Sequence, residues 1–147
     1  MAFTLTTPAF HDGDLVPTEF TCDGRDAAPD LSVTDVPEGT RSFALIMDDP
    51  DAPKGTFTHW LVYDIPTDGS DLAITQGKTL PNGFGRSGYG GPCPPPGDAA
   101  HRYIFTLYAV DVPSLGLRGD SRQDLEDALT THTLGTAQLM GRYQRAA

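Results

Sequence analysis

The chain has 147 residues, of which 38% are hydrophobic, and it carries a formal net charge of −10. This length is typical of a single domain, here residues 1–147, that buries enough surface to fold without cross-links. The acidic surface should repel nucleic acid and anionic membranes, so we expect neither as a partner. Adaptation to high salt is an alternative explanation of the acidity, because screening by salt relieves charge repulsion.

The first thirty residues are rich in turns and lack the basic and apolar segments of a secretory signal. No apolar run in the sequence approaches the ~20 residues that a membrane helix needs. We therefore expect a cytoplasmic protein without stable membrane insertion. Cys22 and Cys93 do not have the spacing of a zinc site. In the cytoplasm both are expected to be thiols, although a disulfide between them remains open as an alternative.

Three apolar segments predict the core strands of a mainly β fold. Residues 43–47 form a continuous apolar run, long enough for a strand that is buried on both faces. Residues 60–65 predict a second strand, and the aromatic and β-branched residues 103–110 predict the strongest one. Residues 66–100 contain many glycines and prolines and are expected to be mostly loop. The strands should form an antiparallel or mixed sheet.

Helical signals appear only late in the sequence. Ser121 and Asp124 have the spacing of a capping box, and apolar residues on one helical face follow them. A second short helix is predicted over residues 134–140, although Gly135 disfavours it. Residues 142–145 are expected to be either a closing strand or a frayed tail.

Polar residues lie where the predicted strands begin or end. Asp49 follows the first core strand and His59 begins the next, so the two share one end of the sheet if these strands are antiparallel neighbours. His101 and Tyr103 are two residues apart at the start of the third strand and therefore point to the same face. Imidazolium and phenol groups donate hydrogen bonds to phosphate or carboxylate oxygens. Asp49 would accept a hydrogen bond from one imidazole and fix its tautomer. These residues predict a small anion pocket.

A loop with the sequence GPCPPPG at residues 91–97 would form a rigid wall of this pocket. Proline has no backbone N–H, so the N–H of Cys93 is the leading main-chain donor for a ligand. A nucleophilic Cys93 thiol beside His101 is a less favoured hypothesis, because the sequence shows no third group to orient the pair.

Four ordered motifs resemble the phosphatidylethanolamine-binding protein (PEBP) family: DPDAP at residues 49–53, THW at 58–60, the proline-rich loop and HRY at 101–103. The sequence is most similar to the bacterial and archaeal branch, usually called Raf-kinase-inhibitor-like, and the similarity spans nearly the whole chain. The resemblance implies a PEBP-like fold, in which a smaller sheet packs on a large central sheet and short helices lie near the C-terminus. It also implies a homodimer.

By motif position, the resemblance assigns eight residues to the ligand site. The pocket residues would be Asp49, His59, His101 and Tyr103, with Cys93 and Pro94 on the wall and Pro53 and Phe57 at the mouth.

We therefore expect a non-catalytic protein that binds phosphate, a phosphomonoester or a phospholipid headgroup without a cofactor or metal. Through this pocket it would regulate a protein partner such as a kinase or protease, although kinase inhibition belongs to some eukaryotic members of the family and does not follow from the pocket alone. The alternative is a metal-dependent enzyme, since Asp49, His59 and His101 have the composition of a two-histidine, one-carboxylate site. A third hypothesis is an inhibitor module whose partner surface lies in the loop 66–90.

Overall fold

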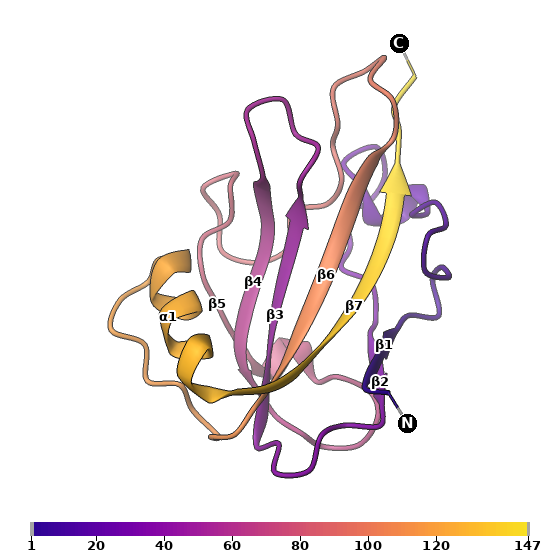
Figure 1. The fold of residues 1–147 in the computed structure, drawn as a ribbon. Helices are drawn as coiled ribbons and strands as arrows, with labels where there is room; N and C mark the ends of the chain where they lie inside the picture. Colours follow the sequence, from indigo (N-terminus) through magenta and orange to yellow (C-terminus); the bar gives the residue numbers. More distant parts are fainter. Residues whose placement is uncertain (1, 147) are drawn as a thin grey trace.

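The computed structural model describes residues 2–146 of the chain. Within these residues, strands dominate and form two sheets, accompanied by one α-helix and two short 3-10 helices (η) (Figure 1). The elements in chain order are β1 (Thr4–Thr6), η1 (Thr18–Phe20), β2 (Ser32–Thr34), β3 (Ser42–Asp49), β4 (Phe57–Ile65), η2 (Ile74–Gln76), β5 (Lys78–Thr79), β6 (His101–Val110), α1 (Arg122–His132) and β7 (Thr133–Tyr143).

The large sheet has the strand order β5-β4-β3-β6-β7, and every neighbouring pair is antiparallel. The small sheet consists of β1 and β2, which are also antiparallel. The predicted mainly β architecture, with a large sheet packed by a smaller one, is therefore confirmed, and the large sheet is antiparallel rather than mixed. The loop between β5 and β6 contains the proline-rich segment, as the sequence predicts.

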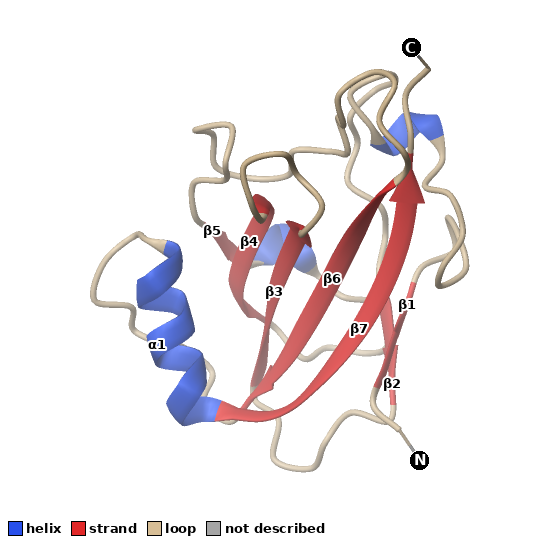
Figure 2. Ribbon diagram, turned by 45° about the horizontal axis from the view of Figure 1, so that its top comes forward, coloured by secondary structure: helices blue, strands red, loops and turns tan. Residues whose placement is uncertain are grey.

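The central strand β3 is buried on both faces because the sheet is covered from two sides. Phe43 belongs to a core cluster that includes Leu5 of the small sheet. Ala44 and Ile46, which point the opposite way, belong to a second cluster with Leu125 of α1. Figure 2 shows α1 on one side of the large sheet and the β1–β2 pair on the other. The apolar run in this strand is continuous because its residues are buried against the small sheet on one face and against α1 on the other.

The helix α1 begins at the predicted capping box. The Ser121 hydroxyl accepts a hydrogen bond from the backbone N–H of Asp124, and the Asp124 carboxylate accepts one from the backbone N–H of Ser121. Two backbone donors of the first turn are thereby satisfied.

The second predicted helix, over residues 134–140, is wrong, because these residues belong to strand β7. Ala137 and Leu139 are buried while their neighbours are more exposed, which is the alternation of a strand. β7 pairs with the long strand β6 from end to end, and this pairing outweighs the local helical preference. Only one helix therefore lies near the C-terminus among the described residues, and Arg142 and Tyr143 end the closing strand.

The expectation that both cysteines are thiols is also wrong, because Cys22 and Cys93 form a disulfide with a Cα–Cα distance of 5.4 Å. The turn after η1 lies against the proline-rich loop, where the Cys22 N–H donates to the Pro92 carbonyl at 3.1 Å. The two residues are 71 positions apart, so only the fold brings them together. Disulfides are rare in most cytosolic proteins, and the cytoplasmic location stays a prediction.

Among residues 2–146, no helix has both the length and the apolar character needed to span a lipid bilayer.

Candidate functional site

Three neighbouring strands bring the predicted polar residues to one end of the large sheet. β3 is antiparallel to both β4 and β6, so its last residues lie beside the first residues of its two neighbours. Asp49 pairs with Phe57 in this register, and Asp48 pairs with Ile104. Asp49, His59 and His101 therefore meet at one sheet end, as their sequence positions predict.

A cavity of about 180 Å³ opens at this end of the sheet. It is lined by Asp49, Ala52, Pro53, Phe57, His59, Phe84, Cys93, Pro94, Pro95, His101 and Tyr103. All eight residues assigned from the sequence are in this set, so the fold brings them together around one cavity. Its volume is below the roughly 300–1,000 Å³ of sites for drug-sized ligands, which suits a small anion or a single headgroup.

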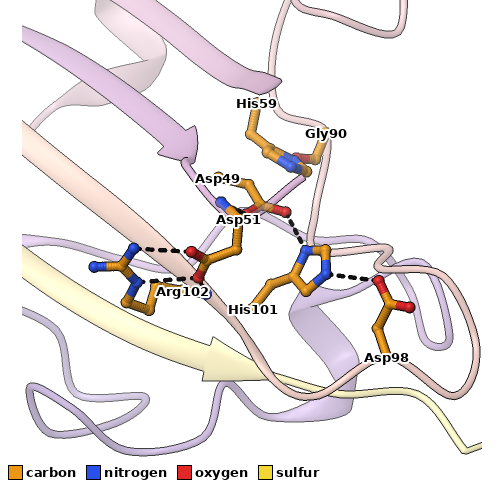
Figure 3. A network of polar contacts seen from close by, with 7 residues as sticks. All are labelled: Asp49, Asp51, His59, Gly90, Asp98, His101 and Arg102. Atoms are coloured by element: carbon orange, nitrogen blue, oxygen red, sulfur yellow. Dashed lines mark hydrogen bonds and ion pairs between the residues drawn. The ribbon is translucent and has the colours of Figure 1, made fainter. Parts of the chain in front are cut away.

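His101 lies between two carboxylates (Figure 3). Its Nδ1 donates to Asp49 Oδ2 at 2.7 Å, and its Nε2 donates to Asp98 Oδ2 at 3.0 Å. Burial disfavours charge on this ring, but the hydrogen bonds to Asp49 and Asp98 outweigh it and raise the pKa of His101 above its ordinary value. Because both ring nitrogens face carboxylates, the structure favours the imidazolium, with a proton on each nitrogen. The prediction that Asp49 accepts a hydrogen bond from one of the imidazoles is confirmed.

His59 has a different environment, although it lies in the same cavity. Its Nδ1 is 2.6 Å from the carbonyl oxygen of Gly90, which can only accept, so this nitrogen carries the proton. Burial lowers the pKa of His59 despite the Gly90 contact and the nearby Asp49 charge, which both oppose the shift. At neutral pH His59 is therefore neutral, and its Nε2 offers a lone pair rather than an N–H. This differs from the expectation that both histidines present donors to the ligand.

Tyr103 supplies a buried hydroxyl group to the cavity. Its side chain is fully buried, and its hydroxyl makes no hydrogen bond to any of the residues 2–146. The ring packs edge-on against His59, with ring centroids 5.2 Å apart, and roughly parallel to His101 at 6.5 Å. Burial above all, and then the negative charge of the nearby Asp49 carboxylate, toward which the hydroxyl has only a loose contact outside hydrogen-bond geometry, raise the pKa of Tyr103, so the phenol stays protonated and remains a donor. An unpaired buried hydroxyl costs roughly 1–3 kcal/mol unless a ligand or water satisfies it.

The proline-rich wall is held from behind by the turn around η1. The disulfide ties Cys93 to Cys22, and the backbone N–H of Gly91 donates to Asp26 at 2.8 Å. Because the Cys93 sulfur is bonded, the hypothesis of a Cys93 nucleophile is wrong. The backbone N–H of Cys93 has no acceptor among the described residues, and it remains a candidate donor for a ligand.

Phe84 and Ala52 line the cavity but were not assigned from the sequence. The Phe84 ring packs edge-on against Phe57 at 4.7 Å between centroids, and it is 42% exposed at the mouth. A Cβ atom on Gly90 would come within 2.4 Å of this ring, so the glycine permits the close approach. A lone aromatic residue between two glycines, at positions 83–85, is the sequence signal that could have identified Phe84.

Asp51 and Arg102 brace the rim rather than face the cavity. The Arg102 guanidinium donates to both Asp51 oxygens, at 2.8 and 3.0 Å, and its backbone N–H donates to the same carboxylate at 2.9 Å. The side-chain hydrogen bond from Arg102 lowers the pKa of Asp51 to about 2. Arg102 therefore pairs with a carboxylate of the chain at the rim of the cavity.

The alternative metal site gains no support from the geometry of the described residues. Among residues 2–146, no three or more His, Cys, Asp or Glu side chains are arranged to hold a metal ion. A histidine binds a metal ion through the lone pair of an imidazole nitrogen. His59 has such a lone pair at Nε2, but in His101 both nitrogens face carboxylates, so a site with two histidine ligands does not form in this arrangement.

With the site described, comparison with known proteins identifies the family. The sequence model of phosphatidylethanolamine-binding proteins matches residues 6–144. The chain belongs to this family. It is 50% identical to a UPF0098 protein of Aquifex aeolicus, covering 93% of this chain and 85% of the relative. It is 43% identical to a UPF0098 protein of Methanothermobacter thermautotrophicus, covering 96% and 98%.

Solved structures of PEBP proteins have the same fold. A PEBP homologue of Chlamydia trachomatis superposes with a TM-score of 0.87 at 37% identity, covering 98% of each chain. Escherichia coli YbcL, described as a member of the mammalian PEBP family, superposes with a TM-score of 0.88 at 29% identity, covering 98% of this chain and 99% of its own. A carboxypeptidase Y inhibitor in complex with its proteinase shares only the fold, with a TM-score of 0.63 at 20% identity.

Proposed function

We propose that this PEBP-family protein binds a small phosphate-type anion, namely phosphate, a phosphomonoester or a phospholipid headgroup, in the cavity at the end of β3, β4 and β6. Binding would be non-catalytic and would need no metal or cofactor. The single observation that carries this proposal is the buried Tyr103 hydroxyl, which has no partner among residues 2–146 and lines the cavity beside two histidines.

The charges around the cavity support an oxygen-rich ligand. His101 is held as a cation by Asp49 and Asp98, and the Tyr103 phenol stays protonated. Together with the Cys93 N–H, these groups are donors of the kind that phosphate oxygens accept. Phe57 and Phe84 shield the mouth, which excludes water and strengthens polar contacts inside.

His59 adds an acceptor to this set of donors. With its proton on Nδ1, neutral His59 can accept a hydrogen bond at Nε2 from a protonated phosphate oxygen. A ligand without a proton would instead require His59 to take one up. We therefore expect proton uptake or a protonated ligand as part of binding.

Titration calorimetry with inorganic phosphate tests the proposal. Each charge-assisted hydrogen bond contributes roughly 1.5–3 kcal/mol, so His101→Ala should weaken binding by roughly ten- to hundredfold. Tyr103→Phe, which removes only the hydroxyl, should weaken it by roughly tenfold. The matched control is His132→Asn, because His132 is a partly exposed histidine that pairs with Asp111 and does not line the cavity. Equal affinity in the wild type and in both cavity variants would reject the assignment.

Regulation of a kinase or protease, and assembly into a homodimer, stay predictions that partner capture and light scattering would test. Among residues 2–146, no arrangement of side chains favours the metal-dependent enzyme over anion binding.

A further inference from the structure

Each ring nitrogen of His101 contacts a carboxylate of the chain, and the partner of Nε2 is the more exposed of the two. Nδ1 is committed to Asp49, whose side chain is only 5% exposed. Nε2 contacts Asp98, whose side chain is 43% exposed. Figure 3 shows the ring between these two groups, with Asp98 on the loop that precedes β6.

We propose that Asp98 is an internal competitor of the anion ligand, and that a bound anion displaces its carboxylate from His101. This inference rests on the proposed function, because it concerns the hydrogen bond that His101, a residue of the cavity lining, would offer to the anion.

The chemistry of the contact supports competition. A carboxylate oxygen and a phosphate oxygen accept the same hydrogen bond from an imidazolium N–H. A single N–H cannot make a good hydrogen bond to a carboxylate and a phosphate at once. Two negative groups that both approach this N–H also repel each other. An anion that approaches His101 therefore has to replace Asp98 or bind without this donor.

The surroundings of Asp98 keep the free-energy cost of moving its carboxylate away from His101 low. The Asp98 side chain is 43% exposed, so its carboxylate is already partly hydrated and can turn outward into solvent, while the His101 ring stays buried and keeps its hydrogen bond to Asp49. Asp98 also follows the turn at Gly97, and the two residues after it are alanines that add no further polar side chain to hold the segment.

Asp98 would thus set the threshold for binding. Weak anions at low concentration would lose the competition, while a phosphate group, which offers several acceptor oxygens, would win it. The neighbouring Asp49 does not compete in this way, because it is buried and also accepts the backbone N–H of Asp51 at 2.8 Å.

Calorimetry with inorganic phosphate at pH 6 and fixed ionic strength tests the inference. Asp98→Asn removes the charge and keeps the shape, and Asp98→Ala removes the side chain. Both variants should bind phosphate roughly three- to tenfold more tightly than the wild type, since the competing carboxylate and its repulsion of the anion are removed. The matched control is Asp68→Asn, an exposed aspartate that follows the far end of β4 and should leave the affinity unchanged.

The results separate the two proposals. If the wild type binds phosphate and the Asp98 variants bind it equally or more weakly, the inference is overturned and the proposed function stands. If neither the wild type nor the variants bind phosphate, both fail. An NMR titration of the apo protein gives a second readout, because Asp98→Asn should lower the pKa of the His101 ring. An unchanged His101 titration would mean that the contact is not formed in solution and would also overturn the inference.

Discussion

The two histidines of the cavity lie at the same end of one sheet and have opposite electrostatic environments. His101, at the start of β6, lies between Asp49 and Asp98, and these hydrogen bonds raise its pKa. His59, near the start of β4, is buried against the Gly90 carbonyl, and burial lowers its pKa. The partners of an imidazole and its burial, rather than its position in the site, thus decide whether it acts as a cation or as a neutral acceptor.

One loop supplies a contact to each histidine. Gly90 at the start of the proline-rich segment accepts from His59, and Asp98 after its end accepts from His101. Between them, Cys93 is bonded to Cys22. The disulfide therefore holds the segment that maintains both environments.

Removal of the disulfide should have the largest effect on this arrangement. The bond closes a loop of 71 residues, so the Cys22→Ser and Cys93→Ser double variant should lose roughly 3–4 kcal/mol of unfolding free energy. Urea denaturation measures this loss, and the double variant with added reductant is the control. NMR spectra of the variant should show that the signals of both histidine rings change together. A change in the signals of only one histidine ring would contradict the inference that one loop maintains the environments of both.

Asp49→Asn should have the next largest effect and should act more strongly on His101, its hydrogen-bond partner, than on His59. It removes the buried negative partner, so the pKa of His101 should fall and the unfolding free energy should drop by about 2–3 kcal/mol near neutral pH. Denaturation and an NMR titration measure the two effects. Asp51→Asn is the matched control, because its ion pair with Arg102 is partly exposed and should contribute less than about 1 kcal/mol. Equal losses in the two variants would argue against a special role for the buried pair.

A pH titration of the wild type should separate the histidines without any substitution. The His101 signal should titrate above 6.5 and the His59 signal below it. The contribution of His101 to stability is then complete below about pH 6.5 and is lost as the pH rises through its raised pKa. The contribution of His59 is present above about pH 6.5 and is lost as the pH falls through its lowered pKa. Two rings that titrate together near 6.5 would refute the contrast.

The difference in affinity between phosphate and sulfate should be the smallest of these effects. At pH 7 phosphate carries a proton that it can donate to His59 Nε2, whereas sulfate does not, so phosphate should bind roughly three- to tenfold more tightly. Protonation of His59, as the pH falls through its lowered pKa, should narrow this gap. Calorimetry with both anions over a series of pH values tests this, and His59→Ala should abolish the preference. A preference that persists in this variant would locate the discrimination elsewhere.

Much of the site could be predicted because its residues lie beside strongly patterned strands. The apolar run before Asp49 and the aromatic run after His101 identify the strands β3 and β6. Once these strands are antiparallel neighbours, the positions of the polar residues at their ends follow from strand geometry. Phe84 could not be predicted in the same way, since its loop has no periodic pattern and only packing against Phe57 places it at the cavity.

Local periodicity and ordered motifs were sufficient to predict the main strands, the capped helix, the family and eight of the residues that line the cavity. Contacts between distant segments make β7 a strand, join Cys22 to Cys93, and give the two histidines different partners, Asp49 for His101 and Gly90 for His59. These features depend on burial and on atoms across the fold. The partner of His59 is 31 positions away and the two cysteines are 71 apart, beyond the range over which a local pattern carries information.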